Sequence, residues 1–108
     1  MKVTICASAR RHGITDAEIR AVLEHSVVRY RVAPRADPEA QLIRMVGDSD
    51  GGPFIEVVAD QVDSGELHVF HAMLLTTTVA REVLQVTGGT VDLTDQVSRR
   101  QRTQQEEP

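Results

Sequence analysis

In the first third of the chain the apolar positions recur at the spacing of an amphipathic helix. Thr15 precedes this run and Glu18 follows three residues later, a spacing that predicts a capping box in which each side chain accepts a hydrogen bond from the other residue's backbone N–H. Ile14 is placed to pack on Ile19 as a hydrophobic staple. We therefore predict a helix that begins after Thr15 and ends near residue 25 or 26.

Beyond this helix the apolar positions alternate in short runs, a pattern typical of strands, and turns rich in Gly, Asp and Pro separate the runs. We expect strands at residues 3–7, 27–32, 41–46, 54–59 and 66–74. Short strands joined by tight turns favour an antiparallel meander of four or five strands. The segment 76–85 predicts a second helix, which Gly88 and Gly89 end. The fold class is therefore α+β, with the helices packed on the sheet.

A chain of 108 residues is long enough for one domain with its own core. We predict a single α+β domain over residues 1–97, with its core between residues 3 and 85. Residues 98–108 contain no apolar residue, so we expect a disordered polar tail there.

Composition narrows the function classes. Aromatic residues make up only 3% of the chain, which argues against a single-stranded nucleic-acid platform of stacked rings. The single cysteine, Cys6, excludes an intrachain disulfide and a cysteine-based zinc site, and it fits a reducing, cytoplasmic setting. No apolar stretch approaches the roughly 20 residues that a membrane-spanning helix needs, so we expect no membrane association.

The net charge of −4 does not favour general affinity for nucleic acids. The charges are unevenly placed, however, because arginines concentrate in the first third and acidic residues dominate from Asp48 to Glu66. A local basic face is one interpretation of this asymmetry, and an ordinary mixed surface is the other. The arginines concerned are Arg10, Arg11, Arg20, Arg29, Arg31 and Arg35.

His12 and His71 are the best candidates for acid–base chemistry near neutral pH, because imidazole titrates in that range. His12 follows Arg10 and Arg11 just before the predicted helix, and His71 lies near the end of the last predicted strand. Arginine suits phosphate binding because its planar fork stays charged and matches phosphate bidentately.

Each histidine also has a structural interpretation. A strand of regular alternation places His71 on one face with Leu67, Val69 and Met73, where it would be a satisfied core or rim residue. His12 would be a loop imidazole without a role, and Ser8 would be a turn residue.

A metal site at His68 and His71 is disfavoured by the same alternation. Residues three apart on a regular strand point to opposite faces, so these two imidazoles would not converge on one ion. We therefore expect no metal site and no cofactor.

The segment Arg11-His12-Gly13-Ile14-Thr15, followed by an amphipathic helix, resembles the "K/R-H-G-[IV]-[ST]" opening of the BrnT-type toxins. These toxins are small ribonucleases of bacterial toxin–antitoxin modules, with a RelE-like α/β fold. Phe70-His71-Ala72-Met73 lies where that family has "I-S-A-R", so Met73 stands in place of the arginine. The N-terminal Trp-Asp segment typical of the family is missing. The resemblance spans residues 3 to 85.

The resemblance implies a metal-independent endoribonuclease that a small cognate antitoxin neutralises. In such chemistry the RNA 2′-hydroxyl attacks the adjacent phosphorus, which requires a base, an acid and cationic phosphate binders. His12 and His71 would supply the base and the acid, and Arg10, Arg11 and Arg35 would bind phosphate. The expected partners are the antitoxin and RNA, and the prediction leaves a homo-oligomer open.

The alternative hypothesis is a non-catalytic binding or interaction module on the same scaffold. Met73 and the negative net charge favour it. The two hypotheses differ in one geometric requirement, because the ribonuclease needs His12, His71 and the arginines on one concave face.

Overall fold

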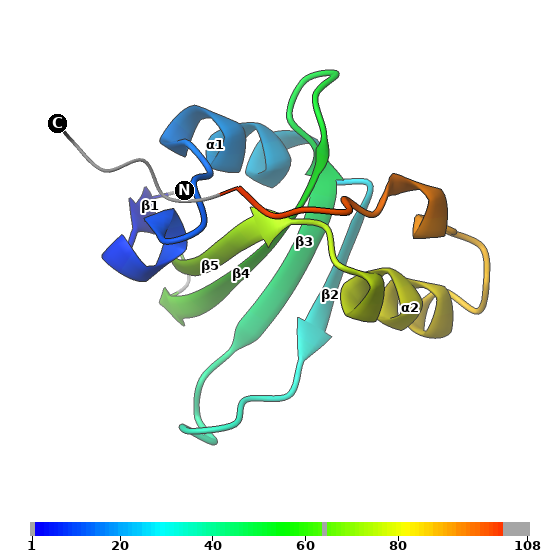
Figure 1. Cartoon of the computed structure of the whole chain (residues 1–108). Coiled ribbons are helices and arrows are strands. Elements are labelled where there is room, and N and C mark those ends of the chain that lie inside the picture. The colour runs from blue at the N-terminus through cyan, green and yellow to red at the C-terminus, as the bar shows by residue number, and fades with distance from the viewer. Residues whose placement is uncertain (1, 64, 103–108) are drawn as a thin grey trace, which may run out of the picture.

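One mixed sheet with a helix on each face forms the body of the protein (Figure 1). The structure is a computed structural model, and it describes residues 2–63 and 65–102. Its elements, in chain order, are β1 (Lys2–Ile5), the 3₁₀ turn η1 (Ala7–Arg10), α1 (Asp16–His25), β2 (Val28–Val32), β3 (Leu42–Asp48), β4 (Phe54–Asp63), β5 (Glu66–Leu74), α2 (Thr77–Val86) and the 3₁₀ turn η2 (Thr94–Gln96). The α+β class is confirmed.

The strands lie in the order β1-β5-β4-β3-β2. Strands β2 to β5 form the expected antiparallel meander. Strand β1 differs, because it pairs with β5 in parallel. The chain leaves β1 through η1 and α1 and enters β2 at the opposite edge of the sheet, and the meander from β2 to β5 then returns it to the side of β1.

Helix α1 covers one face of the sheet, and its start follows the capping box that the sequence predicts. The Glu18 backbone N–H donates to Oγ1 of Thr15 over 3.1 Å, and the Thr15 N–H donates to Oε1 of Glu18 over 3.0 Å. Ile14 and Ile19 are both buried in the cluster beneath the helix. That cluster contains Ile5, Ala9, Ile14, Ile19, Val22, Met45, Ile55, Val57, Ala59, Leu67, Val69, Ala72 and Leu74.

Helix α2 packs on the opposite face, over the β2 and β3 side of the sheet (Figure 1). Its buried residues form a second cluster with Val46, Leu75 and Leu93. Leu93 lies beyond residue 85, so apolar packing extends past the core that we expected. With only 10 residues, α2 leaves part of this face uncovered, and the uncovered part carries the candidate site.

Residues 98–102 belong to the segment for which we expected a disordered tail, but here they lie along the end of β5. The Ser98 N–H donates to the Leu75 carbonyl, and the Gln101 side chain bonds both the N–H and the carbonyl of Leu74. Arg102 then contacts Glu18 over 2.6 Å. The rest of the expected tail, residues 103–108, lies outside the described residues.

A β-bulge at Phe70 changes which side chains share a face. His71 is paired with Val58 and Val69 with Ala59, so Phe70 is an extra residue on β5. Leu67 and Val69 consequently face α1, whereas His71 lines the opposite side of the sheet. The expectation that His71 shares a face with Leu67 and Val69 is therefore wrong, because it assumed regular alternation.

The bulge also removes the reason given against a metal at His68 and His71. His68 alternates with Leu67 and Val69, so it lies on the same face as His71 rather than on the opposite one. Nε2 of His68 instead contacts Oε1 of Glu66 over 2.9 Å. Within residues 2–63 and 65–102, no group of three or more His, Cys, Asp or Glu side chains is placed to hold a metal ion.

None of the helices in the described ranges is long and apolar enough to span a membrane.

Candidate active-site cleft

The sheet surface that α2 leaves uncovered is the floor of a cleft of about 900 Å³. This volume lies within the usual range of small-molecule sites, about 300–1,000 Å³. The cleft combines an apolar floor with charged and hydroxyl side chains. Its lining residues with functional groups are Ser8, Arg11, Arg35, Arg44, Glu56, His71, Thr76, Thr78 and Glu82.

His71 is held in this cleft by Glu56. Nε2 of His71 lies 3.0 Å from Oε1 of Glu56. The other oxygen of Glu56 accepts two hydrogen bonds from Thr76, one from the backbone N–H over 3.0 Å and one from the hydroxyl over 2.7 Å. Glu56 is only 2% exposed, whereas the His71 side chain is 30% exposed. The carboxylate is therefore a buried support, and the imidazole is the group that a ligand reaches.

Burial by itself raises the pKa of Glu56, but the hydrogen bonds from His71 and Thr76 outweigh it, and the pKa lies below its ordinary value. Glu56 is accordingly ionised at neutral pH, and an ionised carboxylate accepts hydrogen bonds only. Nε2 of His71 then carries the proton, which leaves Nδ1 of the neutral ring as a proton acceptor. A carboxylate that fixes one histidine nitrogen so that the other serves as a base is the arrangement of general-base sites.

His12 stands next to His71, with the ring centroids 6.2 Å apart and the rings at 66° in an edge-to-face arrangement. The turn η1 positions it, because the Ser8 hydroxyl donates to the Phe70 carbonyl over 2.7 Å. Gly13 then takes a φ of 75°, which lets the chain turn directly from His12 into the start of α1. Ser8, expected only to be a turn residue, thus joins the His12 segment to the bulge beside His71.

The three arginines predicted to bind phosphate are not equivalent. Arg11 and Arg35 are exposed and line the cleft. Arg10 lies outside the cleft lining and makes a two-pronged contact with Asp16, at 2.9 and 2.8 Å. Three of the five predicted site residues, Arg11, Arg35 and His71, therefore line the cleft. His12 is not among the lining residues but stands beside His71, and Arg10 serves α1 instead.

Three charged residues of the cleft lining, Arg44, Glu56 and Glu82, were missed by the sequence prediction. Glu56 and Arg44 are charged residues within otherwise apolar runs of β4 and β3, at positions that face the cleft. Nε of Arg44 lies 3.0 Å from Oε1 of Glu82, and the same oxygen accepts a hydrogen bond from the Tyr30 hydroxyl over 2.6 Å. Burial and the contact with Glu82 raise the pKa of Tyr30. A charged residue between apolar neighbours in a strand was the signal that could have identified Arg44 and Glu56.

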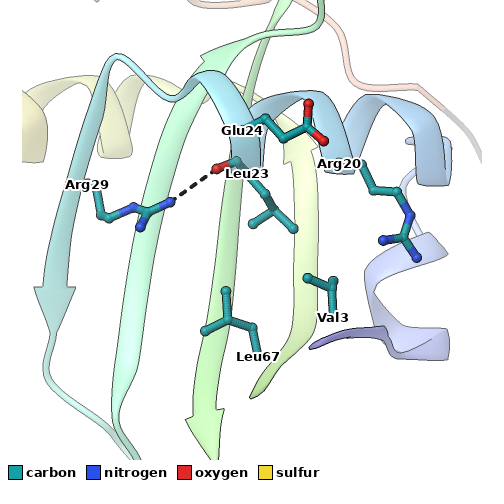
Figure 2. A pocket seen from close by; sticks show the side chains of 6 residues that line it. All are labelled: Val3, Arg20, Leu23, Glu24, Arg29 and Leu67. Carbon is teal, nitrogen blue, oxygen red and sulfur yellow. Dashed lines mark hydrogen bonds between the residues drawn. The ribbon is translucent and has the colours of Figure 1, made fainter. Parts of the chain in front are cut away.

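A second hollow lies on the α1 side of the sheet (Figure 2). It is smaller, at about 240 Å³, and Val3, Leu23 and Leu67 form its apolar part. The Arg29 guanidinium donates to the Leu23 carbonyl over 3.1 Å at its edge. The hollow contains no histidine, and the cleft on the α2 side is therefore the candidate active site.

Comparison with known proteins gave no match to a protein family, a curated protein or a solved structure.

Proposed function

We propose that the protein is a metal-independent endoribonuclease, with the cleft over β3, β4 and β5 as its active site. The observation that carries this proposal is the Glu56-supported His71, with a second imidazole 6.2 Å away. Arg11 and Arg35 line the same cleft and have no ion-pair partner among the described residues. A base, an acid and free cations on one face are what RNA transesterification requires.

In this reaction Nδ1 of His71 takes the proton of the 2′-hydroxyl, and the 2′-oxygen attacks the adjacent phosphorus. The bond from phosphorus to the 5′-oxygen breaks, and protonated His12 gives that oxygen a proton. The products are a 2′,3′-cyclic phosphate and a free 5′-hydroxyl. Arg11 and Arg35 offset the negative charge that builds on the phosphate oxygens.

We further propose that a neutralising partner covers this cleft. The arginines that would bind RNA favour an acidic protein segment as the competitor, because opposite charges steer association. We propose a small antitoxin as that partner, in line with the resemblance to BrnT-type toxins of RelE-like fold.

The direct test incubates the purified chain with single-stranded RNA and analyses the new ends. We expect cyclic phosphate and 5′-hydroxyl ends, a loss of about 100-fold or more in cleavage rate for His71→Ala, and little change for Arg10→Ala. Expression of the chain alone should arrest bacterial growth, and His71→Ala should relieve the arrest. Absence of cleavage by folded wild-type protein, or full activity of His71→Ala, would contradict the proposal.

The alternative of a non-catalytic binding module on the same scaffold rests on Met73, which lines the cleft in place of a cation, and on the negative net charge. It predicts RNA or protein binding that His71→Ala leaves intact, with no new RNA ends.

A further inference from the structure

Arg44 lies on β3 and lines the cleft, and the sequence pattern gave it no role. On the open face of the sheet the residues Tyr30, Arg44, Val58 and His71 form one cross-strand row. Arg44 and His71 are therefore separated by a single strand, and neighbouring strands lie about 4.8 Å apart. A group bound over Val58 would touch both side chains.

The guanidinium of Arg44 is held in place by Glu82, and its terminal nitrogens can still bind a ligand. Nε forms an ion pair with Glu82 and is buried without a hydrogen bond of its own. Glu82 is in turn held by the Tyr30 hydroxyl. Among the described residues the two terminal nitrogens of Arg44 have no hydrogen-bond partner, although the residue lines the cleft. These nitrogens are the fork that recognises phosphate oxygens.

Charge in the cleft favours an anionic ligand. Its lining contains Arg11, Arg35 and Arg44 against two glutamates. Both carboxylates already have partners inside the protein, since Glu56 accepts from His71 and Thr76 and Glu82 contacts Arg44 and Tyr30. The arginine donors are thus available to a ligand, and the carboxylates are not.

Next to Arg44 the cleft becomes apolar. Leu42 is two residues away on the same strand and is paired with Val32, and Pro34 follows in the adjoining loop. Arg35 lies at the end of this surface. An apolar patch between two guanidinium groups suits the planar ring of a base, because arginine stacks on aromatic faces.

We propose that Arg44 anchors the phosphate of one nucleotide unit and that its base lies over Val32, Leu42 and Pro34. The inference rests on the cleft of the proposed function but is independent of its chemistry. It assigns single-stranded RNA as the substrate class, because a paired base would not reach this patch.

The test is a titration with nucleoside 3′-monophosphates and with inorganic phosphate, followed by calorimetry and NMR. Arg44→Gln should weaken nucleotide binding by about tenfold or more, because the charge-assisted hydrogen bonds to the phosphate are lost. Arg10→Gln is the matched control and should bind as the wild type does. Arg44→Lys, which keeps the charge but loses the fork, should bind with intermediate affinity and covers the case in which Arg44→Gln fails to fold.

A second variant tests the base position. Leu42→Asn should weaken binding of the nucleotide by about tenfold and leave binding of inorganic phosphate unchanged. Equal affinity of the wild type for phosphate and nucleotide would overturn the base assignment. Undiminished nucleotide binding by both Arg44 variants, or no binding by the wild type, would overturn the anchor.

The cleavage assay separates the two proposals. Nucleotide binding that depends on Arg44, without RNA cleavage, would contradict the proposed ribonuclease and support this inference. RNA cleavage in which Arg44→Gln has the KM and kcat of the wild type would support the proposed ribonuclease and contradict this inference. His71→Gln should abolish cleavage, because it removes the proposed base.

Discussion

Glu56 and His71 are diagonal neighbours on two adjacent strands, and their side chains meet at 3.0 Å on the open face of the sheet. The carboxylate also receives the backbone N–H of Thr76, the residue that caps α2. One buried side chain therefore joins the candidate base to the start of the helix that bounds the cleft. Substitution of Glu56 is therefore expected to change both the stability of the fold and the position of His71.

Replacement of Glu56 by alanine should destabilise the fold by roughly 2–4 kcal/mol, because the Thr76 N–H and the His71 ring lose a buried acceptor. Chemical denaturation measures this loss. Glu66→Ala is the control, since Glu66 pairs with His68 in a more exposed contact and should cost less than about 1 kcal/mol. A Glu56→Ala protein as stable as the wild type would contradict the buried role of this carboxylate.

Glu56→Gln should retain the shape of the site and change its pH dependence. The pKa of Glu56 is lower in the folded protein than its ordinary value of 4.5, so its contribution to stability is complete above that value. The contribution is lost as the pH falls through the lower pKa of the folded state. The stability difference between wild type and Glu56→Gln should therefore shrink as the pH falls below about 4.5.

Denaturation curves at several pH values measure that difference. Glu18 also has a lowered pKa, through its contacts with Arg102 and Thr15, so the wild type alone would report both groups. Subtracting the curve of the variant removes the contribution of Glu18, which both proteins share. A stability difference that grows as the pH falls would contradict a lowered pKa of Glu56 in the folded protein.

Tyr30 should remain protonated at pH values where an ordinary tyrosine ionises. Burial and the hydrogen bond to Glu82 raise its pKa above the ordinary value of 10. The chain has one tyrosine and no tryptophan, so an ultraviolet absorbance titration reports this residue alone. Glu82→Gln should lower the midpoint, but not to 10, because burial is the larger cause. A wild-type midpoint at 10 would exclude the contact with Glu82.

Thr15→Ala should cost about 1 kcal/mol, because α1 loses the side chain that caps the Glu18 N–H. The melting temperature should fall by several degrees, whereas Thr15→Ser, which keeps the hydroxyl, should stay close to the wild type. Differential scanning calorimetry of the two variants and the wild type measures these melting temperatures. Equal melting temperatures for Thr15→Ala and wild type would show that the cap is not needed.

Local patterns predicted the elements well because their causes are local. The capping box at Thr15 and the alternation in β2 to β5 act over a few residues, and the strands and both helices lie close to their expected positions. The pairing of β1 with β5 could not be predicted in this way, since it joins residues more than 60 positions apart. Parallel pairing depends on packing of the whole chain.

The candidate site shows the same division. His12 and His71 were identified by their chemistry, since imidazole is distinctive in a short sequence. Glu56 and Arg44 were not, because a single charged residue in a strand has many interpretations until its cross-strand neighbours are known. Arg10 was predicted to bind phosphate because it lies near His12 in the sequence. Its guanidinium instead forms an ion pair with Asp16, six positions further on.

The bulge at Phe70 has a consequence for how β5 tolerates a change in length. Phe70 is the extra residue between Val69, which faces α1, and His71, which lines the cleft. Deletion of Phe70 would join these two residues directly, and regular alternation would still leave Val69 under α1 and the imidazole on the cleft side. A single-codon insertion that the strand absorbs as a bulge therefore preserves the pattern of both faces, and the buried and the exposed side of this strand can vary independently of its length.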